Sequence, residues 1–308
     1  MKSARRKAFS ERKSKKKKEN IRFLSWKITL PAFLIATVFF IVKLNTHVWD
    51  GVNKVAFAYP SADNVEIVVM DPRLTELTTF VIPGETEVDV ARNFGALRIK
   101  NVWQLGINEN LGGNLLSETV TQNFLFPITL WTGKDPGLLD GSLKNRLSFV
   151  FFPGRTNIHF GDRLRIMTFA SKVSELGKSK IDLKESKFLS CGKLKDGQLG
   201  CWIDGPISQR LTVYFSDNEI ENKLLRVNIS DETGTVGISE KLGEIIQVIG
   251  GKVVSINRGS SHDTDCVIQG KDLNMIKKIS ELFSCRIERK DSPFDLDIRI
   301  GKKFAERF

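Results

Sequence analysis

The sequence predicts an α/β chain with one membrane-spanning helix followed by two folded regions. Three observations carry this prediction. An uncharged apolar run lies near the N-terminus, β-rich and helical runs alternate after residue 63, and their order becomes β-α-β-β-α-β-β after residue 222. We expect a basic cytoplasmic tail at 1–22, a transmembrane helix at 23–44, a stalk at 45–62, a mixed α/β domain at 63–222 and a small α/β domain at 223–308.

The positive charge of the chain is concentrated at its start. Residues 1–27 hold twelve Lys or Arg and two Glu, so they carry +10 of the total +11 and leave +1 for the other 281 residues. A protein that follows a nucleic-acid backbone needs positive charge spread over a folded face. We therefore expect no nucleic-acid partner.

The uncharged run from Ile28 to Val42 predicts the membrane segment. Extending it to 23–44 gives 22 residues, a helix of about 33 Å that can cross a hydrocarbon core of about 30 Å. Trp26 and Trp49 are expected as interfacial anchors. The preceding Lys and Arg residues stay inside, so we expect a single-pass protein of the cytoplasmic membrane with its N-terminus inside and its folded regions outside.

A cleaved signal peptide is the alternative to an anchor. Ala56-Phe57-Ala58 has the small-x-small form that signal peptidase reads. The apolar run ends near Leu44, however, and several polar residues lie between the two. We therefore expect an anchored protein rather than a secreted one.

Four cysteines would face an oxidising compartment in this topology, which permits disulfides. Cys191 and Cys201 flank a glycine-rich turn that would form a hairpin and bring the two thiols together. Cys266 lies in a strand-like run and Cys285 follows a helical run. We predict the pairs Cys191–Cys201 and Cys266–Cys285, although four cysteines allow three pairings. The sequence has no closely spaced Cys/His pairs, so we expect no metal site of that kind.

The first folded region begins with two β-rich runs that end at turn signals. The run 65–71 ends at Asp71-Pro72, and the run 76–83 ends at Pro83-Gly84. Two helices are expected within 101–126, separated by Gly112-Gly113. We further expect strands at 86–90, 96–99 and 179–183, a buried element at 143–152 and a helix at 162–172.

The second folded region has a clearer alternation. Gly250-Gly251 follows an amphipathic run and marks the end of a helix. We expect helices at 237–249 and 273–283, and strands at 224–230, 252–257, 264–269, 285–289 and 294–301.

The stretch Leu225–Ile300 resembles the C-terminal domain of LytR-CpsA-Psr proteins of bacterial envelopes. That domain opens with a strand and an Asn-Gly-Thr-Gly-x-x-Gly-Leu-Ala-like turn, and Asp231-Glu232-Thr233-Gly234-Thr235-Val236-Gly237-Ile238-Ser239 stands in its place here. The closing DLDIRIGKKF is similar to the family's last strand and basic ending. In 65–131, MDPRLTELTTFVIPGETEV resembles the strand–turn–strand before the family's Ile-Pro-Arg-Asp-Thr motif, and GGNLLSETVTQNF resembles the helix that follows.

The resemblance implies an extracytoplasmic role in cell-wall assembly. The family transfers glycopolymers from a polyprenyl pyrophosphate carrier to peptidoglycan, with arginines on the pyrophosphate and Mg²⁺ held by acidic residues. Such chemistry needs fixed cations because charge builds on the phosphoryl oxygens. The partners implied are the membrane and a polyprenyl-pyrophosphate-linked glycan or peptidoglycan. No cofactor is expected, except Mg²⁺ for an active transferase.

This sequence departs from the family pattern at the expected arginine, where it reads Pro83-Gly84-Glu85. By resemblance, Arg98 could take the place of a downstream basic residue, with Arg92 and Lys100 near it and Glu85 as a surviving acid. These four are the ligand-binding candidates, and no catalytic residue is assigned. The other interpretation is ordinary surface charge on a half-buried strand.

We therefore predict a membrane-anchored envelope protein of LytR-CpsA-Psr type that binds lipid-linked glycopolymers or envelope partners without the family's catalysis. Two alternatives are a scaffold that binds no lipid and an active glycopolymer phosphotransferase with a rearranged site. A long apolar cavity closed by at least two arginines would indicate a lipid pocket. A filled core with an exposed apolar patch would indicate the scaffold.

Overall fold

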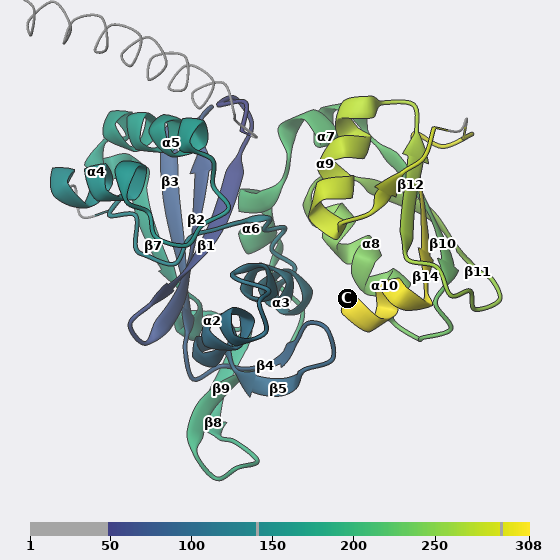
Figure 1. Cartoon of the computed structure of the whole chain (residues 1–308), viewed down its shortest axis with the longest axis horizontal. Helices are drawn as coiled ribbons and strands as arrows, with labels where there is room; N and C mark the ends of the chain where they lie inside the picture. The colour runs from purple at the N-terminus through teal and green to yellow at the C-terminus, as the bar shows by residue number, and fades with distance from the viewer. Residues whose placement is uncertain (1–48, 140–141, 290–291) are drawn as a thin grey trace, which may run out of the picture. The chain divides into compact units, whose positions relative to one another are not determined.

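The computed structural model describes residues 49–139, 142–289 and 292–308 (Figure 1). The expected tail at 1–22 and transmembrane helix at 23–44 lie outside these residues. None of the helices in the described part of the chain has the length and apolar character needed to cross a membrane. Residues Trp49–Phe308 form one compact mixed α/β unit that contains two five-stranded sheets. The predicted boundary between residues 222 and 223 is not tested by this division and stays a prediction.

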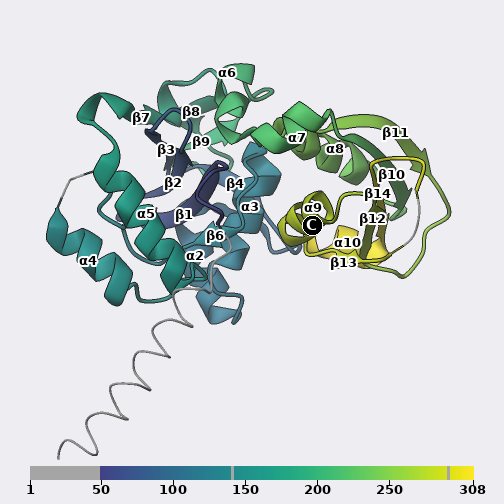
Figure 2. The ribbon, with the colours of Figure 1, turned by 90° about the horizontal axis from the view of Figure 1, so that it is seen from above.

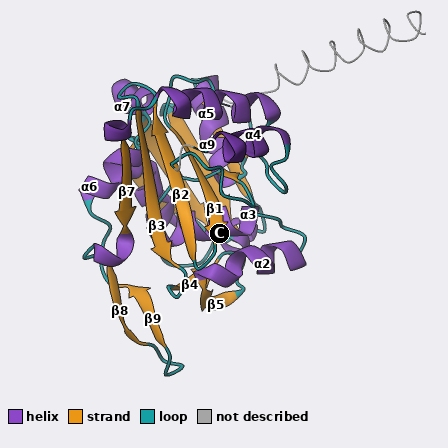
Figure 3. Ribbon diagram, turned by 90° about the vertical axis from the view of Figure 1, so that its left-hand side faces the viewer, coloured by secondary structure: helices purple, strands orange, loops and turns teal. Residues whose placement is uncertain are grey.

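The first sheet has the strand order β6-β1-β2-β3-β7 (Figure 3). Its three central strands form an antiparallel meander, and β6 and β7 pair with its outer edges in parallel. The strands are β1 (Val55–Ser61), β2 (Asn64–Asp71), β3 (Glu76–Pro83), β6 (Leu130–Trp131) and β7 (Lys178–Asp182).

Both faces of the first sheet are covered by helices. On β2, Val65 and Ile67 enter one hydrophobic core, whereas Val68 and Met70 enter the other. Successive side chains of a strand point to opposite faces, so a sheet buried on both sides needs an almost continuous apolar run. Helices α2 (Ile99–Asn108) and α3 (Asn114–Phe124) contribute to the first core, and α4 (Leu143–Phe151) and α5 (Phe160–Lys172) to the second.

Two short hairpins and two short helices complete this part of the chain. They are β4 (Glu87–Val90) with β5 (Gly95–Arg98), β8 (Leu189–Lys193) with β9 (Leu199–Ile203), α6 (Gln209–Thr212) and α7 (Asn218–Lys223). In the second hairpin Cys191 lies directly opposite Cys201, and the two form a disulfide. This is the pair that the glycine-rich turn predicts.

The second sheet has the order β11-β10-β14-β12-β13 and is covered by helices α8 and α9, which contribute to a single core. Its elements run in the order β-α-β-β-α-β-β, as the hydrophobic pattern predicts. They are β10 (Arg226–Glu232), α8 (Ile238–Val248), β11 (Lys252–Arg258), β12 (Cys266–Gly270), α9 (Leu273–Phe283), β13 (Arg286–Ile287), β14 (Leu296–Gly301) and a final helix α10 (Lys302–Arg307).

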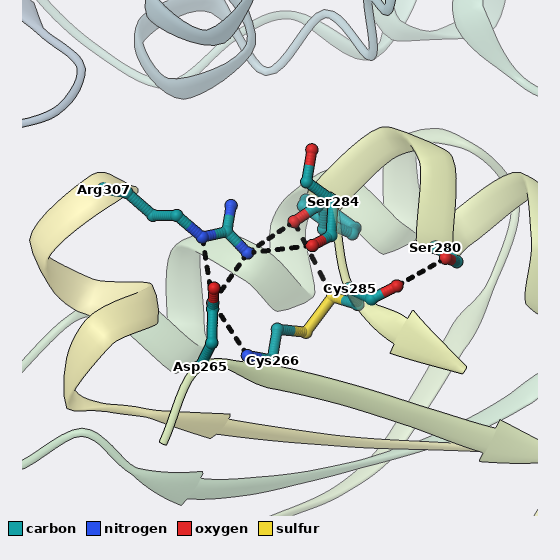
Figure 4. The surroundings of a disulfide bond; sticks show 7 residues. Asp265, Cys266, Ser280, Ser284, Cys285 and Arg307 are labelled. Atoms are coloured by element: carbon teal, nitrogen blue, oxygen red, sulfur yellow. Dashed lines mark hydrogen bonds and ion pairs between the residues drawn. A yellow bond between two sulfur atoms is a disulfide. The ribbon is translucent and has the colours of Figure 1, made fainter. Parts of the chain in front are cut away.

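The predicted Cys266–Cys285 disulfide links β12 to the segment that follows α9 (Figure 4). Arg307 of α10 binds at the same place. Its guanidinium donates to the Asp265 carboxylate at 2.9 Å and to the Phe283 carbonyl at 2.8 Å. The disulfide and the arginine therefore tie the end of the chain to β12 and α9.

Three sequence expectations are corrected by the structure. Residues 55–61, assigned to the stalk, form the strand β1 with Phe57 and Ala58 fully buried. Residues 143–152, expected to be buried, form the helix α4 up to Phe151 with one exposed side, and Phe152 directly after the helix is 74% exposed. Trp49, expected as an interfacial anchor, is 5% exposed because it packs edge-on against Phe169 of α5. In each case, whether a side chain is buried depends on whether a segment distant in sequence packs against it.

Candidate functional site

Three of the four predicted ligand-binding residues lie together beside the β4–β5 hairpin. Arg98 ends β5, Lys100 lies in the first turn of α2, and Glu85 precedes β4. The Arg98 side chain is 10% exposed and donates to the Glu85 backbone carbonyl at 3.1 Å. Lys100 forms an ion pair with the Glu85 carboxylate, which also lies 3.8 Å from the Arg98 guanidinium.

The disulfide-bonded β8–β9 hairpin closes over this cluster. Asp196, in the turn of the hairpin, accepts a hydrogen bond from Arg98 Nη2 at 2.6 Å. A backbone hydrogen bond from Gln198 lowers the pKa of the Asp196 carboxyl, and the charge of Arg98 lowers it further. Cys201 donates its backbone N–H to the Glu85 carbonyl at 3.2 Å. The hairpin therefore supplies a carboxylate that balances the positive charge of Arg98.

Close packing leaves little room between the hairpin and the arginine. A Cβ atom added to Gly200 would lie 2.1 Å from Arg98 Nη1 and 2.7 Å from the Glu85 carbonyl oxygen. The cluster contains two cations and two carboxylates, so its formal charges balance. Arg98 is thus held by protein groups on several sides, as expected for a structural ion-pair network.

The fourth predicted residue, Arg92, lies in a separate place. It occupies the turn between β4 and β5 with a φ of 65°, and its guanidinium forms a bidentate ion pair with Glu118 of α3, with both contacts at 2.7 Å. The hydrogen bonds to Glu118 raise the pKa of Arg92. The chain therefore does not bring Arg92 and Arg98 to one phosphate group.

The acidic residues of this region do not match a magnesium site. Glu85 and Asp196 are each engaged by a cation, and the described residues contain no group of three or more His, Cys, Asp or Glu that could hold a metal ion. Mg²⁺ prefers carboxylates whose oxygens are free to coordinate it. No reaction step through a metal is derived for this chain.

A groove of about 570 Å³ provides a second candidate site. Its floor is apolar, with Leu125, Ile203 and Ile207 among its residues, and its edge along α8 carries Lys241 and Glu244, whose charges cancel. Amide side chains occur repeatedly around it. They belong to Gln122, Asn123, Gln209 and Gln247.

Gln122 is the most unusual residue of this groove. It is 7% exposed, and its Nε2 has no hydrogen-bond partner among the described residues. Buried polar groups are normally hydrogen-bonded, so an orphan amide often marks a place where a ligand or water completes the network. The sequence carries a signal of this residue, because Leu115, Thr119 and Gln122 share one helical stripe and an amide interrupts its buried side.

The core beside the groove is filled by aromatic rings. Phe80, Phe124 and Phe126 are fully buried, and Phe126 stacks on Phe215 with ring centroids 4.2 Å apart. Neither the groove nor a smaller cavity of about 180 Å³ beside Lys54 and Tyr214 is lined by an arginine. Neither of these two cavities therefore has the form expected of a lipid site, an apolar pocket closed by arginines.

Comparison with known proteins identifies neighbours among solved structures alone. No family model and no curated protein matches the chain. B. subtilis TagV is 12% identical, with a TM-score of 0.36, and the match covers 49% of this chain and 91% of that one. B. subtilis TagT is 11% identical, with a TM-score of 0.37 and coverage of 53% and 89%.

A third neighbour is the LytR-CPS2A-Psr family protein YwtF (TagT) with bound octaprenyl pyrophosphate lipid. It is 11% identical, with a TM-score of 0.34, and the match covers 52% of this chain and 88% of that one. The structure neighbours are thus LytR-CPS2A-Psr proteins, the family that the sequence motifs resemble. At these TM-scores the likeness carries no argument about the activity of this chain, and its function has to be argued from its own residues.

Proposed function

We propose that this chain is a single-pass envelope protein of LytR-CpsA-Psr type that binds a glycan segment of a cell-wall polymer without transferring it. The observation that carries the proposal is the pairing of every predicted cation with a carboxylate. Arg98 pairs with Asp196 and Glu85, Lys100 with Glu85, and Arg92 with Glu118. A pyrophosphate would have to displace these carboxylates before any cation could stabilise its charge.

The groove fits the non-ionic part of such a polymer. Sugar hydroxyls donate and accept hydrogen bonds, which suits the amides of Asn123, Gln209 and Gln247, and the apolar floor suits the less polar face of a sugar ring. The rim charges of Lys241 and Glu244 cancel, so the groove has no preference for an anionic group. These features favour a neutral glycan over a phosphate.

The anchored topology belongs to the same proposal. The apolar run 23–44 and the basic residues before it support a membrane span with the folded unit outside. Cleavage after Ala58 would cut through β1, which lies between β6 and β2 in the first sheet. This placement favours retention of the N-terminal segment. The two disulfides are consistent with an oxidising compartment.

The test compares two probes on the full-length chain in lipid nanodiscs. One probe is a polyprenyl pyrophosphate, and the other is a soluble, lipid-free preparation of cell-wall glycan strands. We expect the strands to bind, and the double variant Gln209→Leu/Gln247→Leu to weaken that binding while the protein stays folded. Arg98→Ala is the matched control and is expected to leave strand binding unchanged.

The opposite pattern would overturn the proposal. Tight binding of polyprenyl pyrophosphate that Arg98→Ala abolishes would place the cation cluster in ligand binding. Mg²⁺-dependent turnover of a polyprenyl-pyrophosphate-linked glycan would then show an active phosphotransferase. If the folded protein binds neither probe, the remaining function is that of a scaffold that binds no glycan.

A further inference from the structure

Helix α4 carries an apolar stripe that the protein core does not use. Leu143, Leu147 and Phe151 are four residues apart along the helix and are 68%, 41% and 55% exposed, and Phe152 directly after them is 74% exposed. Residues spaced by four lie on the same side of a helix. Arg146, Phe149 and Val150 are the buried residues of the helix, so the exposed stripe lies beside the face that packs on the core, and its one ring contact is between Phe151 and Phe160.

The stripe lies in a basic segment of the folded unit. Residues 142–172 contain six Lys or Arg and one acid, Asp162, which is fully buried. Lys144, in the first turn of α4, and Arg155, four residues after its end, are exposed. Lys134 reaches the loop after the helix. Its Cε lies 3.3 Å from the position that a Cβ atom added to Gly154 would take. An exposed apolar stripe flanked by basic side chains is the pattern of a helix that lies in the surface of an anionic membrane.

Helix α4 is joined to the point where the chain enters the folded unit. Trp49 donates its backbone N–H to Asp162 of α5 at 3.1 Å, and its carbonyl accepts from Arg165 of the same helix at 2.5 Å. Helix α5 in turn contacts α4, since Arg163 donates to the Phe149 carbonyl at 3.3 Å, and Figures 1 and 2 both show the two helices side by side.

The length of chain before Trp49 limits how far this entry point can be from a membrane. The predicted span ends at Leu44, five residues earlier. Five residues reach at most about 18 Å when fully extended. A span at 23–44 would therefore hold Trp49 and the α5 residues bound to it close to the headgroups.

We propose that the Leu143–Leu147–Phe151 stripe of α4, together with Phe152 directly after the helix, inserts into the outer surface of an anionic lipid bilayer. The inference rests on the anchored topology of the proposed function. Lipid acyl chains would cover the four apolar side chains, and lipid phosphates would pair with Lys144 and Arg155. The contact would orient the folded unit on the membrane, which a single point of attachment does not do.

The experiment uses the full-length chain with the photoreactive residue p-benzoylphenylalanine placed at one position at a time. The protein is reconstituted into vesicles of phosphatidylethanolamine and phosphatidylglycerol, irradiated and examined for lipid adducts by mass spectrometry. Position 152 tests the stripe. Position 199 is the matched control, because Leu199 is equally exposed, at 78%, on the β8–β9 hairpin. Position 40 tests the predicted span.

We expect lipid adducts at positions 40 and 152 and none at 199. Leu143→Glu/Leu147→Glu should lower the yield at 152 severalfold without changing the yield at 40, and replacing phosphatidylglycerol by phosphatidylcholine should lower it as well. Adducts at 40 but not at 152 would overturn the stripe contact and leave the anchor intact. Adducts at neither position would overturn both, and adducts at 152 to a second copy of this chain in place of lipid would overturn the membrane contact.

Discussion

The two five-stranded sheets of this chain have strands of similar length but bury them differently. In the first sheet, alternate residues of β2 enter two different cores. In the second sheet, Val227 and Ile229 of β10 enter the core, whereas Asn228 between them joins a row of polar groups on the other face. A sheet covered on both faces is held by apolar packing, and a sheet covered on one face can carry hydrogen-bonding groups on the other.

The polar row crosses four strands of the second sheet. Asn228 donates to Asp297 at 2.9 Å and accepts from Asn257 at 2.9 Å and from Ser255, and Gln269 donates to Asp297 at 3.0 Å. Asn228 is 4% exposed. The stability of the first sheet should therefore fall most when a buried side chain is truncated, and that of the second sheet when a hydrogen-bond partner is removed.

Phe80→Ala should have the largest effect on stability. Phe80 of β3 is fully buried. The centroid of its ring lies 5.3 to 5.5 Å from the ring centroids of Phe126, Tyr214 and Phe215. Truncating a buried Phe lowers the free energy of unfolding by about 3–5 kcal/mol. Denaturant unfolding measures this loss. Val254→Ala on the second sheet is the control, because Val254 is 41% exposed and should change stability by less than about 1 kcal/mol. Equal losses would contradict the comparison.

Removal of the Cys266–Cys285 disulfide should have the next largest effect. The bridge spans 19 residues and both cysteines are buried, so replacing them by Ala should lower the free energy of unfolding by about 2–4 kcal/mol. The Cys191–Cys201 bridge spans 10 residues in a peripheral hairpin. Its removal should speed amide hydrogen exchange in that hairpin more than it lowers global stability. A larger global loss for the hairpin pair would refute this ranking.

Asn228→Ala tests the polar row directly. The substitution removes the hydrogen bonds that the buried Asn228 makes with Asp297, Ser255 and Asn257, and one hydrogen bond contributes about 0.5–1.5 kcal/mol to stability. Thermal unfolding at constant pH measures the change. Arg299→Ala on the neighbouring strand is the control, because Arg299 is largely exposed and should contribute about 0.5 kcal/mol or less. No difference between the two variants would show that the row does not stabilise the sheet.

Asp231 should make the stability of the second sheet depend slightly on pH in the acid range. Burial opposes its ionisation, yet hydrogen bonds from Ser239 at 2.6 Å and from Thr233 outweigh it, and the pKa of the Asp231 carboxyl is lowered. The pKa of Asp231 is therefore lower in the folded chain than in the unfolded chain. The ionised carboxylate stabilises the fold above about pH 4, and this stability is lost as the pH falls through the pKa of the folded state.

The Asp231→Asn variant measures this contribution. Its free energy of unfolding should lie below that of the unmodified chain at neutral pH, and the gap should close as the pH falls below 4. A gap that stays constant with pH would show that the hydrogen-bond geometry, and not the charge, stabilises the turn before α8.

Much of the secondary structure follows from local patterns. The run 76–83 becomes β3 and the run 273–283 becomes α9, because their period and end signals do not depend on distant residues. Cys191 and Cys201 pair because a short turn places them opposite each other in a hairpin. The pattern of 55–61 does not predict a strand, because this short mixed segment gains its burial from β2 and β6.

The candidate sites depended more on tertiary contacts. The pattern of charges placed Arg98, Lys100 and Glu85 within one short segment, but Asp196, which neutralises Arg98, comes from a hairpin 98 residues away. The groove residues come from α3, from the segment around residue 205 and from α8. No local signal links these three segments.

The sequence by itself determined the α/β class, the positions of most helices and strands, the Cys191–Cys201 pair and the long apolar run before the folded unit. These properties follow from periodicity, turn chemistry and composition, which act over a few residues. Tertiary structure alone decided that β1 is a central strand, that the cations of the β4–β5 region are neutralised, and that the apolar residues of α4 stay exposed. The physical reason is that burial and charge compensation depend on which distant segments meet, and an apolar stripe has the same sequence pattern whether a protein core or a lipid surface covers it.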